Sequence, residues 1–233
     1  TSDGIFLSTN KGMAWTRAEL TSIYVRCFAV PLDGHHDTDF FAGADGVFRS
    51  SDNGASWKTA SNGLPRIFPL WDTSPYVGVY SLLWKETTLF AGTNGNGIYR
   101  TTDKGTTWTQ ANAGLTSATI FSLACSGGNL YAGTIKGVFM STNDGESWYL
   151  IGLANSDVRF VAVVGSSLFA GTADGLFLSG NNGSSWTEVS AGLGNTIVWA
   201  LSVSGTNLFA ATSGGVWRRP VSELITGIEV GSG

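Results

Sequence analysis

One eight-residue phrase is written five times along this chain of 233 residues. Residues 50–57 read SSDNGASW, 101–108 read TTDKGTTW and 141–148 read STNDGESW, and looser copies stand at 8–15 and 179–186. The tryptophan that ends each copy recurs about every 40 residues, with one step about ten residues longer. A period of this length indicates a repeat architecture, so the chain is expected to fold as an array of similar units.

One complete unit, residues 158–193, shows what is repeated. It contains four short apolar runs, separated by turns rich in Gly, Asn and Asp, at 158–164, 167–172, 176–180 and 186–190. Four short strands per unit, without a sustained helical period, predict an all-β fold, a β-propeller of four-stranded antiparallel blades. Such a sheet has two apolar faces, and packing the blades against one another buries both.

The repeated phrase is expected to form the hairpin between the third and fourth strands of each blade. Ser or Thr, and Asp or Asn two positions later, supply acceptors for the backbone N–H groups of a tight turn. The glycine supplies a positive φ, and the tryptophan packs under the turn as an apolar plug. The positions concerned are Ser8, Asn10, Gly12 and Trp15; Ser50, Asp52, Gly54 and Trp57; Thr101, Asp103, Gly105 and Trp108; Ser141, Asn143, Gly145 and Trp148; and Ser179, Asn181, Gly183 and Trp186.

The phrase resembles the Asp-box, S-x-D-x-G-x-x-W, of BNR-repeat propellers. That superfamily includes sialidases, sortilin-type receptors, xyloglucanases and Ycf48-like photosystem II assembly factors. Asn10, Asn143 and Asn181 replace the aspartate, which still leaves a side-chain acceptor. In the family the box is structural and lies away from the active face, so the resemblance implies the fold and says little about function.

The two ends of the chain bear on the number of blades. Residues 1–9 align with 172–180, so the chain starts in the turn before a third strand, as at a processed or trimmed end. The last repeat supplies three strands, and residues 219–221 stand where another box would begin. Five blades are expected within residues 1–220, with six as the alternative. Residues 221–233 are expected to be a tail or linker, and they resemble the connection to a C-terminal sorting domain in secreted bacterial propellers.

Composition excludes some functions. The net charge is −4, the pI is about 5.1 and 13% of the residues are charged. No basic stripe is visible, which argues against nucleic-acid binding, and no apolar run is long enough for a membrane span. Cys27 and Cys125 are expected to be separate buried thiols. An extracellular or cell-surface location is expected, with the periplasm as an alternative.

The longest departure from the repeat is an insertion within residues 63–80, between a fourth strand and the next first strand. Strand alternation places it on the face of the second-to-third-strand turns, opposite the boxes. Its aromatic and polar side chains form a candidate binding site, since aromatic groups on a proline-stiffened loop can anchor a partner or stack on a sugar. The candidates are Arg66, Phe68, Trp71, Asp72 and Tyr76. The alternative is a loop that buries its own aromatic residues over the central channel.

A second departure, residues 31–39, contains Asp33, His35, His36, Asp37 and Asp39. Adjacent histidines point apart on an extended chain, and the sequence has no third histidine to complete a set. A solvent-exposed hairpin tip is therefore expected here, with a weak site for a hard cation as the alternative. No metal or cofactor is predicted.

Catalytic constellations are not evident in the sequence. Arg49 and Arg100 occupy equivalent third-strand positions and are interpreted as solvent-facing. A glycoside hydrolase needs two carboxylates across a cleft, and nothing pairs Asp72 with Asp157. The prediction is a non-catalytic extracellular or cell-surface module that binds or scaffolds a protein or glycan. The alternatives are a lectin-like propeller and a sialidase-like glycoside hydrolase. The oligomeric state is left open, with a monomer as one alternative.

Overall fold

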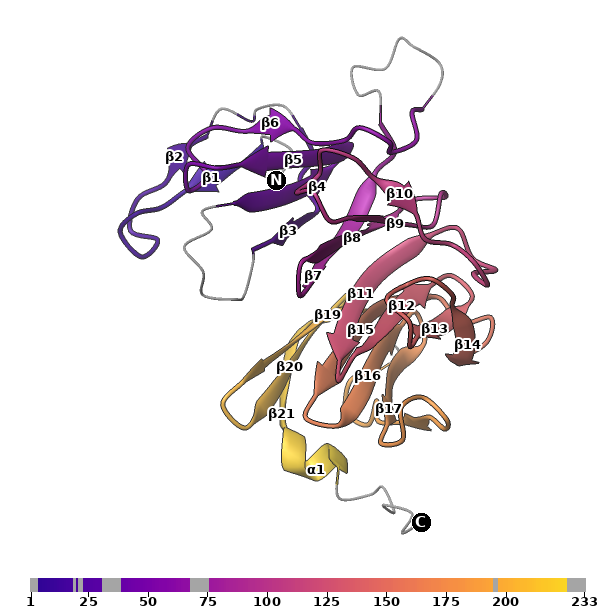
Figure 1. Ribbon diagram of the computed structural model, residues 1–233. Coiled ribbons are helices and arrows are strands. Elements are labelled where there is room, and N and C mark those ends of the chain that lie inside the picture. Colours follow the sequence, from indigo (N-terminus) through magenta and orange to yellow (C-terminus); the bar gives the residue numbers. More distant parts are fainter. Residues whose placement is uncertain are drawn as a thin grey trace. The chain divides into compact units, whose positions relative to one another are not determined.

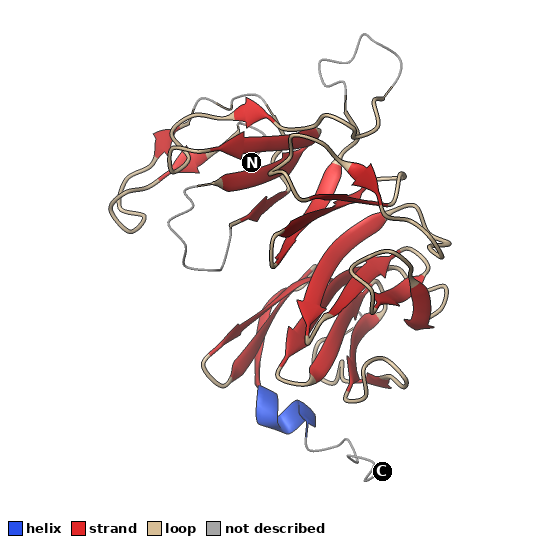
Figure 2. Cartoon of the chain, viewed as in Figure 1, coloured by secondary structure: helices blue, strands red, loops and turns tan. Residues whose placement is uncertain are grey.

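The regular secondary structure of the described residues is almost entirely β-strand. The computed structural model describes residues 4–18, 20, 23–30, 39–67, 76–194 and 197–225 (Figure 1). These residues form antiparallel sheets and one short helix, α1 (Val221–Ile225) (Figure 2). The chain divides into two compact units, residues 1–112 with 118–120 and residues 113–117 with 121–233.

The first unit contains three sheets in chain order. A two-stranded sheet is followed by two four-stranded sheets, each ordered from first to fourth strand. The strands are β1 (Phe6–Leu7) and β2 (Thr16–Arg17); β3 (Cys27–Ala29), β4 (Phe40–Ala44), β5 (Gly46–Ser50) and β6 (Lys58–Thr59); and β7 (Val79–Lys85), β8 (Thr88–Thr93), β9 (Ile98–Thr101) and β10 (Thr109–Gln110).

The second unit repeats the pattern and ends on an incomplete sheet. Two four-stranded sheets are followed by a three-stranded sheet and α1. The strands are β11 (Ile120–Ser126), β12 (Asn129–Thr134), β13 (Gly137–Ser141) and β14 (Tyr149–Gly152); β15 (Val158–Val164), β16 (Ser167–Thr172), β17 (Gly175–Ser179) and β18 (Thr187–Glu188); and β19 (Val198–Ser204), β20 (Asn207–Thr212) and β21 (Gly215–Pro220). The prediction of four short strands per repeat is confirmed, and the number of blades stays a prediction.

Close packing between successive sheets depends on one glycine in each second strand. A Cβ on Gly92 would collide with Ile120, and one on Gly171 would collide with Val198. A Cβ on Gly43 would come within 3.0 Å of Val79, and one on Gly133 within 2.9 Å of Val158. Because glycine has no side chain, the first strand of the next sheet can pack closely against the second strand that contains it. The buried Val or Ile then fixes the position of that first strand against the glycine.

The five boxes form the hairpins that the sequence predicts. In the second box, Ser50 Oγ accepts the Gly54 N–H at 2.8 Å and Asp52 Oδ1 accepts the Ser56 N–H at 2.8 Å. Equivalent pairs of bonds occur in the other four boxes. Each box glycine has a positive φ, between 78° and 87°. The polar residues of the phrase therefore close the turn upon itself.

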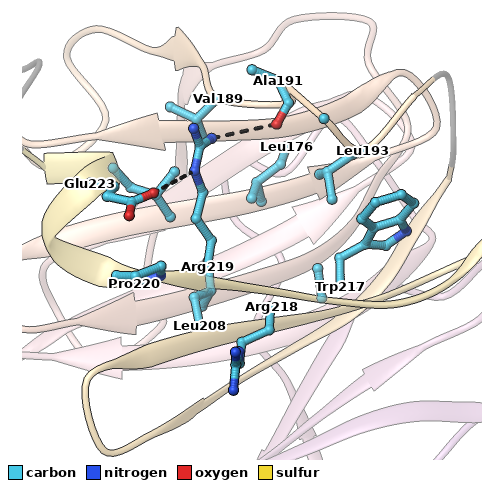
Figure 3. A pocket seen from close by; sticks show the side chains of 13 residues that line it. Leu176, Val189, Ala191, Leu193, Leu208, Trp217, Arg218, Arg219, Pro220 and Glu223 are labelled. Atoms are coloured by element: carbon cyan, nitrogen blue, oxygen red, sulfur yellow. Dashed lines mark hydrogen bonds and ion pairs between the residues drawn. The ribbon is translucent and has the colours of Figure 1, made fainter.

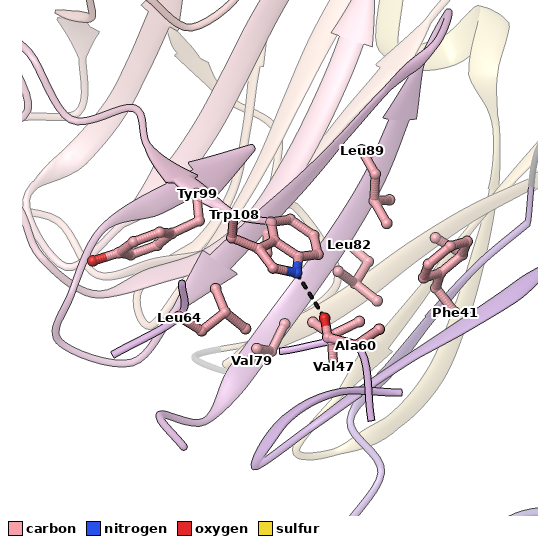
Figure 4. Close-up of a cluster of buried hydrophobic side chains, with 11 residues drawn as sticks. Phe41, Val47, Ala60, Leu64, Val79, Leu82, Leu89, Tyr99 and Trp108 are labelled. Carbon is pink, nitrogen blue, oxygen red and sulfur yellow. Dashed lines mark hydrogen bonds between the residues drawn. The ribbon is translucent and has the colours of Figure 1, made fainter. Parts of the chain in front are cut away.

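The box tryptophans are not all buried, contrary to expectation. Trp108 is 4% exposed, and its indole N–H donates to the Ala60 carbonyl of the preceding sheet at 2.7 Å (Figure 4). Trp148 is 3% exposed, whereas Trp15 is 64% exposed. The Trp108 side chain thus packs against the sheet that precedes it in the chain, and not only against its own turn.

Two polar predictions are also corrected. Asp39 is 2% exposed rather than at a solvated tip, and the Arg49 guanidinium donates to both of its carboxylate oxygens at 2.8 Å. Lys104 adds an ion pair at 2.9 Å. Burial raises the pKa of the Asp39 carboxyl, but the hydrogen bonds from Arg49 and Lys104 outweigh it and hold the pKa below its ordinary value. Arg49 therefore joins parts of the fold instead of facing solvent alone.

Both cysteines are free thiols, and their residues are half-buried rather than fully buried as expected. Burial raises the pKa of the Cys27 thiol to about 12, because the thiolate would lose its hydration. Among the described helices, none has the length and apolar character needed to cross a bilayer. Asp33, His35, His36 and Asp37 lie outside the described residues, and the remainder contains no group of three potential metal ligands.

Candidate functional site

The first strands carry one equivalent position in five successive sheets. In each, a buried Val or Ile packs on the preceding sheet, and the next residue is larger and partly or largely accessible. These next residues are Arg26, Tyr80, Phe121, Arg159 and Trp199. Two arginines and three aromatic residues thus occupy this position, and each arginine has an aromatic residue at the equivalent position of a neighbouring sheet, which favours cation–π contacts.

In the second unit the three residues at this position form one cluster. The Arg159 guanidinium carbon lies 4.5 Å from the centroid of the Phe121 ring and 5.4 Å from that of Trp199. Arg159 also forms an ion pair with Asp157 at 2.5 Å, and both side chains are 30% exposed. Trp199 is 47% exposed. A cation, a carboxylate and an accessible indole are therefore held together at the start of β15 and β19.

Polar groups in this cluster are incompletely satisfied. Asp157 Oδ1 and Arg159 Nε are buried and have no hydrogen-bond partner among the described residues. Buried unsatisfied polar atoms are few in native proteins and commonly mark a functional group or a water site. The cluster therefore has more hydrogen-bonding capacity than its protein contacts use.

The first unit contains a related cluster around Arg26. Its guanidinium carbon lies 5.4 Å from the Tyr24 ring and 5.7 Å from the Tyr80 ring. Arg26 Nη1 donates to Asp45 Oδ1 at 2.9 Å. Tyr24 is 59% exposed. Among the described residues, both units thus contain an arginine that pairs with an aspartate and lies against aromatic rings.

The ends of the predicted insertion lie on the expected face. Val77 accepts a backbone hydrogen bond from Gly46 and donates one to Pro65, and Gly78 is bridged to Asp45. The connection therefore passes along the turn between the second and third strands, at the end of the sheet that also holds Arg26. Phe68, Trp71 and Asp72 lie outside the described residues and stay predicted members of the site.

The two described candidates of the insertion contact each other. Arg66 and Tyr76 form a β-bridge, and the guanidinium carbon lies 5.6 Å from the tyrosine ring. Arg66 is exposed, whereas Tyr76 is half-buried and lines a groove of about 510 Å³ with Lys58 and Asn62. Tyr76 therefore lines a groove together with residues of the outer strand β6.

Residues 81–207 match the family described as the DUF6242 beta propeller domain. This match spans more than half of the chain. The chain belongs to the DUF6242 beta-propeller family. Comparison with curated protein sequences finds no match.

Solved structures share the propeller fold of this DUF6242 domain. The extracellular domain of the one-component system BT4673 from B. thetaiotaomicron is 20% identical, with a TM-score of 0.71 over 93% of this chain and 29% of that one. The GH74 xyloglucanase from Xanthomonas campestris is 16% identical, with a TM-score of 0.70 over 94% and 41%. YCF48 bound to D1 peptide is 14% identical, with a TM-score of 0.67 over 98% and 72%. The chain thus spans less than half the length of the first two, and these likenesses concern the fold alone.

Sequence reasoning missed the arginine clusters of the DUF6242 domain. No local motif joins Arg26 to Tyr80, or Arg159 to Phe121 and Trp199, because these rings lie about 40 to 55 residues away in the sequence. An alignment of the repeats could have found these residues. When the buried Val or Ile of each first strand is aligned, the arginines and aromatic residues occupy the same, following position. The cluster offers aromatic faces for stacking and charged groups for hydrogen bonds.

Proposed function

We propose that this DUF6242 propeller is a non-catalytic binding or scaffold domain that works outside the cell or at its surface. Its ligand, a protein or a glycan, binds on the face that carries the fourth-to-first-strand connections. Two structural relatives support this type of role: one is an extracellular domain, and another was solved with a bound peptide.

The observation that carries the proposal is the cluster of Arg159, Phe121 and Trp199. Its indole is 47% exposed beside a guanidinium and a carboxylate that each keep a buried atom without a partner among the described residues. Tryptophan and arginine are the side chains most often responsible for binding energy at interfaces. A ligand that covers Trp199 would also exclude water from the Arg159–Asp157 pair and strengthen it.

A binding experiment with single variants tests this role. Trp199→Ala and Arg159→Ala are expected to weaken capture of the ligand at least about ten-fold, as truncation of an interface anchor does. Tyr149→Ala is the matched control, because Tyr149 is an aromatic residue of similar exposure, 45%, on the outer strand β14. Binding that survives both cluster variants, in proteins with unchanged melting, would refute the site.

A lectin-like function is the second candidate, favoured by the exposed Trp199 beside Asp157. An indole face can stack on the apolar face of a sugar ring while carboxylate and guanidinium groups hydrogen-bond its hydroxyls. A glycan array with the wild-type domain and Trp199→Ala distinguishes the ligands. Glycan signals that the wild-type domain gives and the Trp199→Ala variant loses support a lectin. Binding to protein partners without any glycan signal supports the scaffold.

A glycoside hydrolase is the third candidate, because a xyloglucanase has the same fold. Two carboxylates about 5–9.5 Å apart would be needed. Asp157 forms an ion pair with Arg159, and Asp72 lies outside the described residues, so no pair of carboxylates facing one cleft is seen among the described residues. Release of reducing sugar from xyloglucan or sialosides by the wild-type domain would overturn the non-catalytic proposal.

We propose five blades for the domain, with six as the alternative. The four complete four-stranded sheets, the two-stranded sheet β1–β2 and the three-stranded sheet β19–β21 are compatible with either number. An experimental structure of the intact protein decides between them.

A further inference from the structure

The groove of about 510 Å³ beside Tyr76 gathers basic side chains of the first unit. Arg49 of β5, Lys58 of β6 and Lys104 of the third box all line it, and every lining residue belongs to that unit. None of the described residues that line the groove is acidic. Three cations therefore converge in one groove of a chain whose net charge is −4.

A single buried carboxylate lies against two of these cations. Asp39 is 2% exposed, and it pairs with Arg49 at 2.8 Å and with Lys104 at 2.9 Å. Arg49 uses two of its five N–H groups on Asp39, which leaves three for other acceptors. Lys58 is exposed and forms no ion pair with another described residue. The groove thus keeps positive charge and hydrogen-bond donors beyond those that Asp39 engages.

Two of the three cations face each other across neighbouring strands. Arg49 of β5 is directly opposite Lys58 of β6. Like charges directly opposite in a sheet destabilise it. The equivalent pairs of the other four-stranded sheets contain at most one charge: Arg100 with Thr109, Met140 with Tyr149, and Leu178 with Thr187. The sheet therefore does not require Lys58, and such a local conflict is typical of a functional site.

The first two sheets of the second unit have none of these charges at the same positions. In the aligned repeats, Asp39, Arg49, Lys58 and Lys104 correspond to Asn129, Met140, Tyr149 and Asn182. Both units nevertheless form the same four-stranded sheets and the same box hairpins. The charged set is thus a property of one groove and is not needed to build the repeat.

The pocket of the last sheet has a different character. It measures about 330 Å³ and is lined largely by apolar side chains, among them Leu176, Val189 and Leu208. Figure 3 shows Arg219 beside Glu223, to which its Nε donates at 3.3 Å. A carboxylate that lines this pocket therefore already pairs with a cation, whereas no described residue of the first-unit groove supplies one.

The uncharged lining of the first-unit groove favours a saccharide over a peptide. Hydroxyl and amide side chains form most of it: Ser51, Thr59, Asn62 and Thr106. Such groups both donate and accept hydrogen bonds, as sugar hydroxyls require, and an aromatic ring such as that of Tyr76 can lie against the apolar face of a sugar. A peptide anchor needs an apolar pocket, and Ala60 is the only aliphatic side chain among the described residues that line this groove.

We propose that this groove binds an acidic saccharide, with a carboxylate or sulfate group held between Arg49, Lys58 and Lys104. The sugar ring lies along Asn62 and Tyr76. Guanidinium and ammonium groups form charge-assisted hydrogen bonds with anionic oxygens, so both kinds of acidic group fit the site. The groove and the Arg159 cluster belong to different units, so this site does not depend on the function proposed for that cluster.

Isothermal titration calorimetry of the full chain tests the proposal with defined saccharides. Tetragalacturonate offers carboxylates, a carrageenan tetrasaccharide offers sulfates without carboxylates, and cellotetraose is neutral. At least one acidic saccharide is expected to bind with a Kd of about 1 mM or lower, and cellotetraose at least about ten-fold more weakly. The comparison of the two acidic saccharides identifies the preferred group. Raising the salt concentration should weaken the binding, because the cations are partly exposed.

Substitutions of Lys58 separate binding from folding. Lys58→Gln should weaken the acidic saccharide at least about ten-fold without lowering the melting temperature, because it removes the repulsion with Arg49. Lys58→Glu should abolish binding and raise the melting temperature, since opposite charges then face each other. Lys11→Gln is the matched control, because it removes an exposed lysine of the first box, and it should bind as the wild type does.

Several results would overturn the proposal. These are a wild-type protein that binds neither acidic saccharide or binds cellotetraose equally well, and an affinity that Lys58→Gln leaves unchanged or Lys11→Gln lowers as much. Hexaglutamate that binds more tightly than either saccharide would identify an acidic peptide as the ligand instead. Trp199→Ala should retain the saccharide. If it loses the saccharide and Lys58→Gln does not, the ligand binds at the Arg159 cluster and not in this groove.

Discussion

The first and third boxes are nearly the same phrase, STNKGMAW and TTDKGTTW, and fold into the same turn. Both close through a hydroxyl that accepts the glycine N–H and an Asn or Asp that accepts a second N–H. Yet Trp15 is 64% exposed and Trp108 is 4% exposed. The phrase therefore specifies the hairpin, whereas the preceding sheet decides whether the tryptophan contributes to a core.

The second box shows an intermediate case. Trp57 is half-buried, packing beside a cluster that contains Ile5 and Ala18 of the two-stranded sheet region. Its indole N–H donates to the Gly54 carbonyl of its own box at 3.1 Å. The indole N–H of Trp108 instead donates to a carbonyl of the bend after the preceding fourth strand. A sheet of two strands thus offers less cover than the four strands in front of Trp108.

The largest expected difference between the boxes is in stability. Trp108→Ala should lower the free energy of unfolding by about 3–5 kcal/mol, because it leaves a cavity in a packed cluster. Trp15→Ala should change it by less than about 0.5 kcal/mol in the monomer, as exposed positions do. Urea unfolding at a low protein concentration measures both. Equal losses of stability would mean that Trp15, like Trp108, is packed in a buried site.

The glycines in the bends that follow the fourth strands β6 and β18, Gly63 and Gly192, extend the comparison. Gly63→Ala and Gly192→Ala impose a similar left-handed strain, but only the first also meets a tryptophan carbonyl. Gly63→Ala is therefore expected to cost about 1–3 kcal/mol more than Gly192→Ala, which is a typical cost of overpacking. The melting temperatures of the two variants provide the measurement. Indistinguishable values would show that the backbone around Gly63 can shift to accommodate the added methyl group.

Asp39 connects the third box to an earlier sheet through Lys104 and holds Arg49 on its own sheet. Asp39→Asn should destabilise by about 1–2 kcal/mol, less than a fully buried pair, since the side chains of Arg49 and Lys104 are 33% and 41% exposed. Chemical unfolding of the variant tests this value. Arg49→Met provides a second variant, and stability unaffected by either change would contradict a structural role.

The smallest expected effect is acid sensitivity, which should differ between boxes with aspartate and asparagine. Hydrogen bonds, foremost from the hydroxyls of Ser56 and Thr107, lower the pKa of Asp52 and Asp103 to about 2. Their contribution is present above the ordinary value of about 3.9 and is lost as the pH falls toward about 2. Asp103→Asn should therefore flatten the decline of the melting temperature between about pH 4 and 2, and Asn181→Asp should steepen it. Parallel curves would contradict this assignment.

The sequence predicted what depends on local periodicity. Four short strands per repeat, the hairpin at each box and positive φ at Gly54 or Gly105 follow from residue types a few positions apart. It did not predict partners set by packing between sheets. Asp39 finds Lys104 from the next sheet, and Arg159 finds Trp199 from the next first strand, and no spacing rule joins them in advance.

The backward-facing tryptophan has a consequence for how such a chain can change in length. The repeat of β7 to β10 carries a tryptophan, Trp108, that packs on the preceding repeat, and a glycine, Gly114, that admits the tryptophan of the following one. A duplicated repeat therefore brings both halves of a new joint with it, and neighbouring repeats need no compensating substitution. Tandem duplication of this repeat therefore needs no change elsewhere, whereas residues 219–221 replace the phrase by Arg-Pro-Val and a helix begins at Val221.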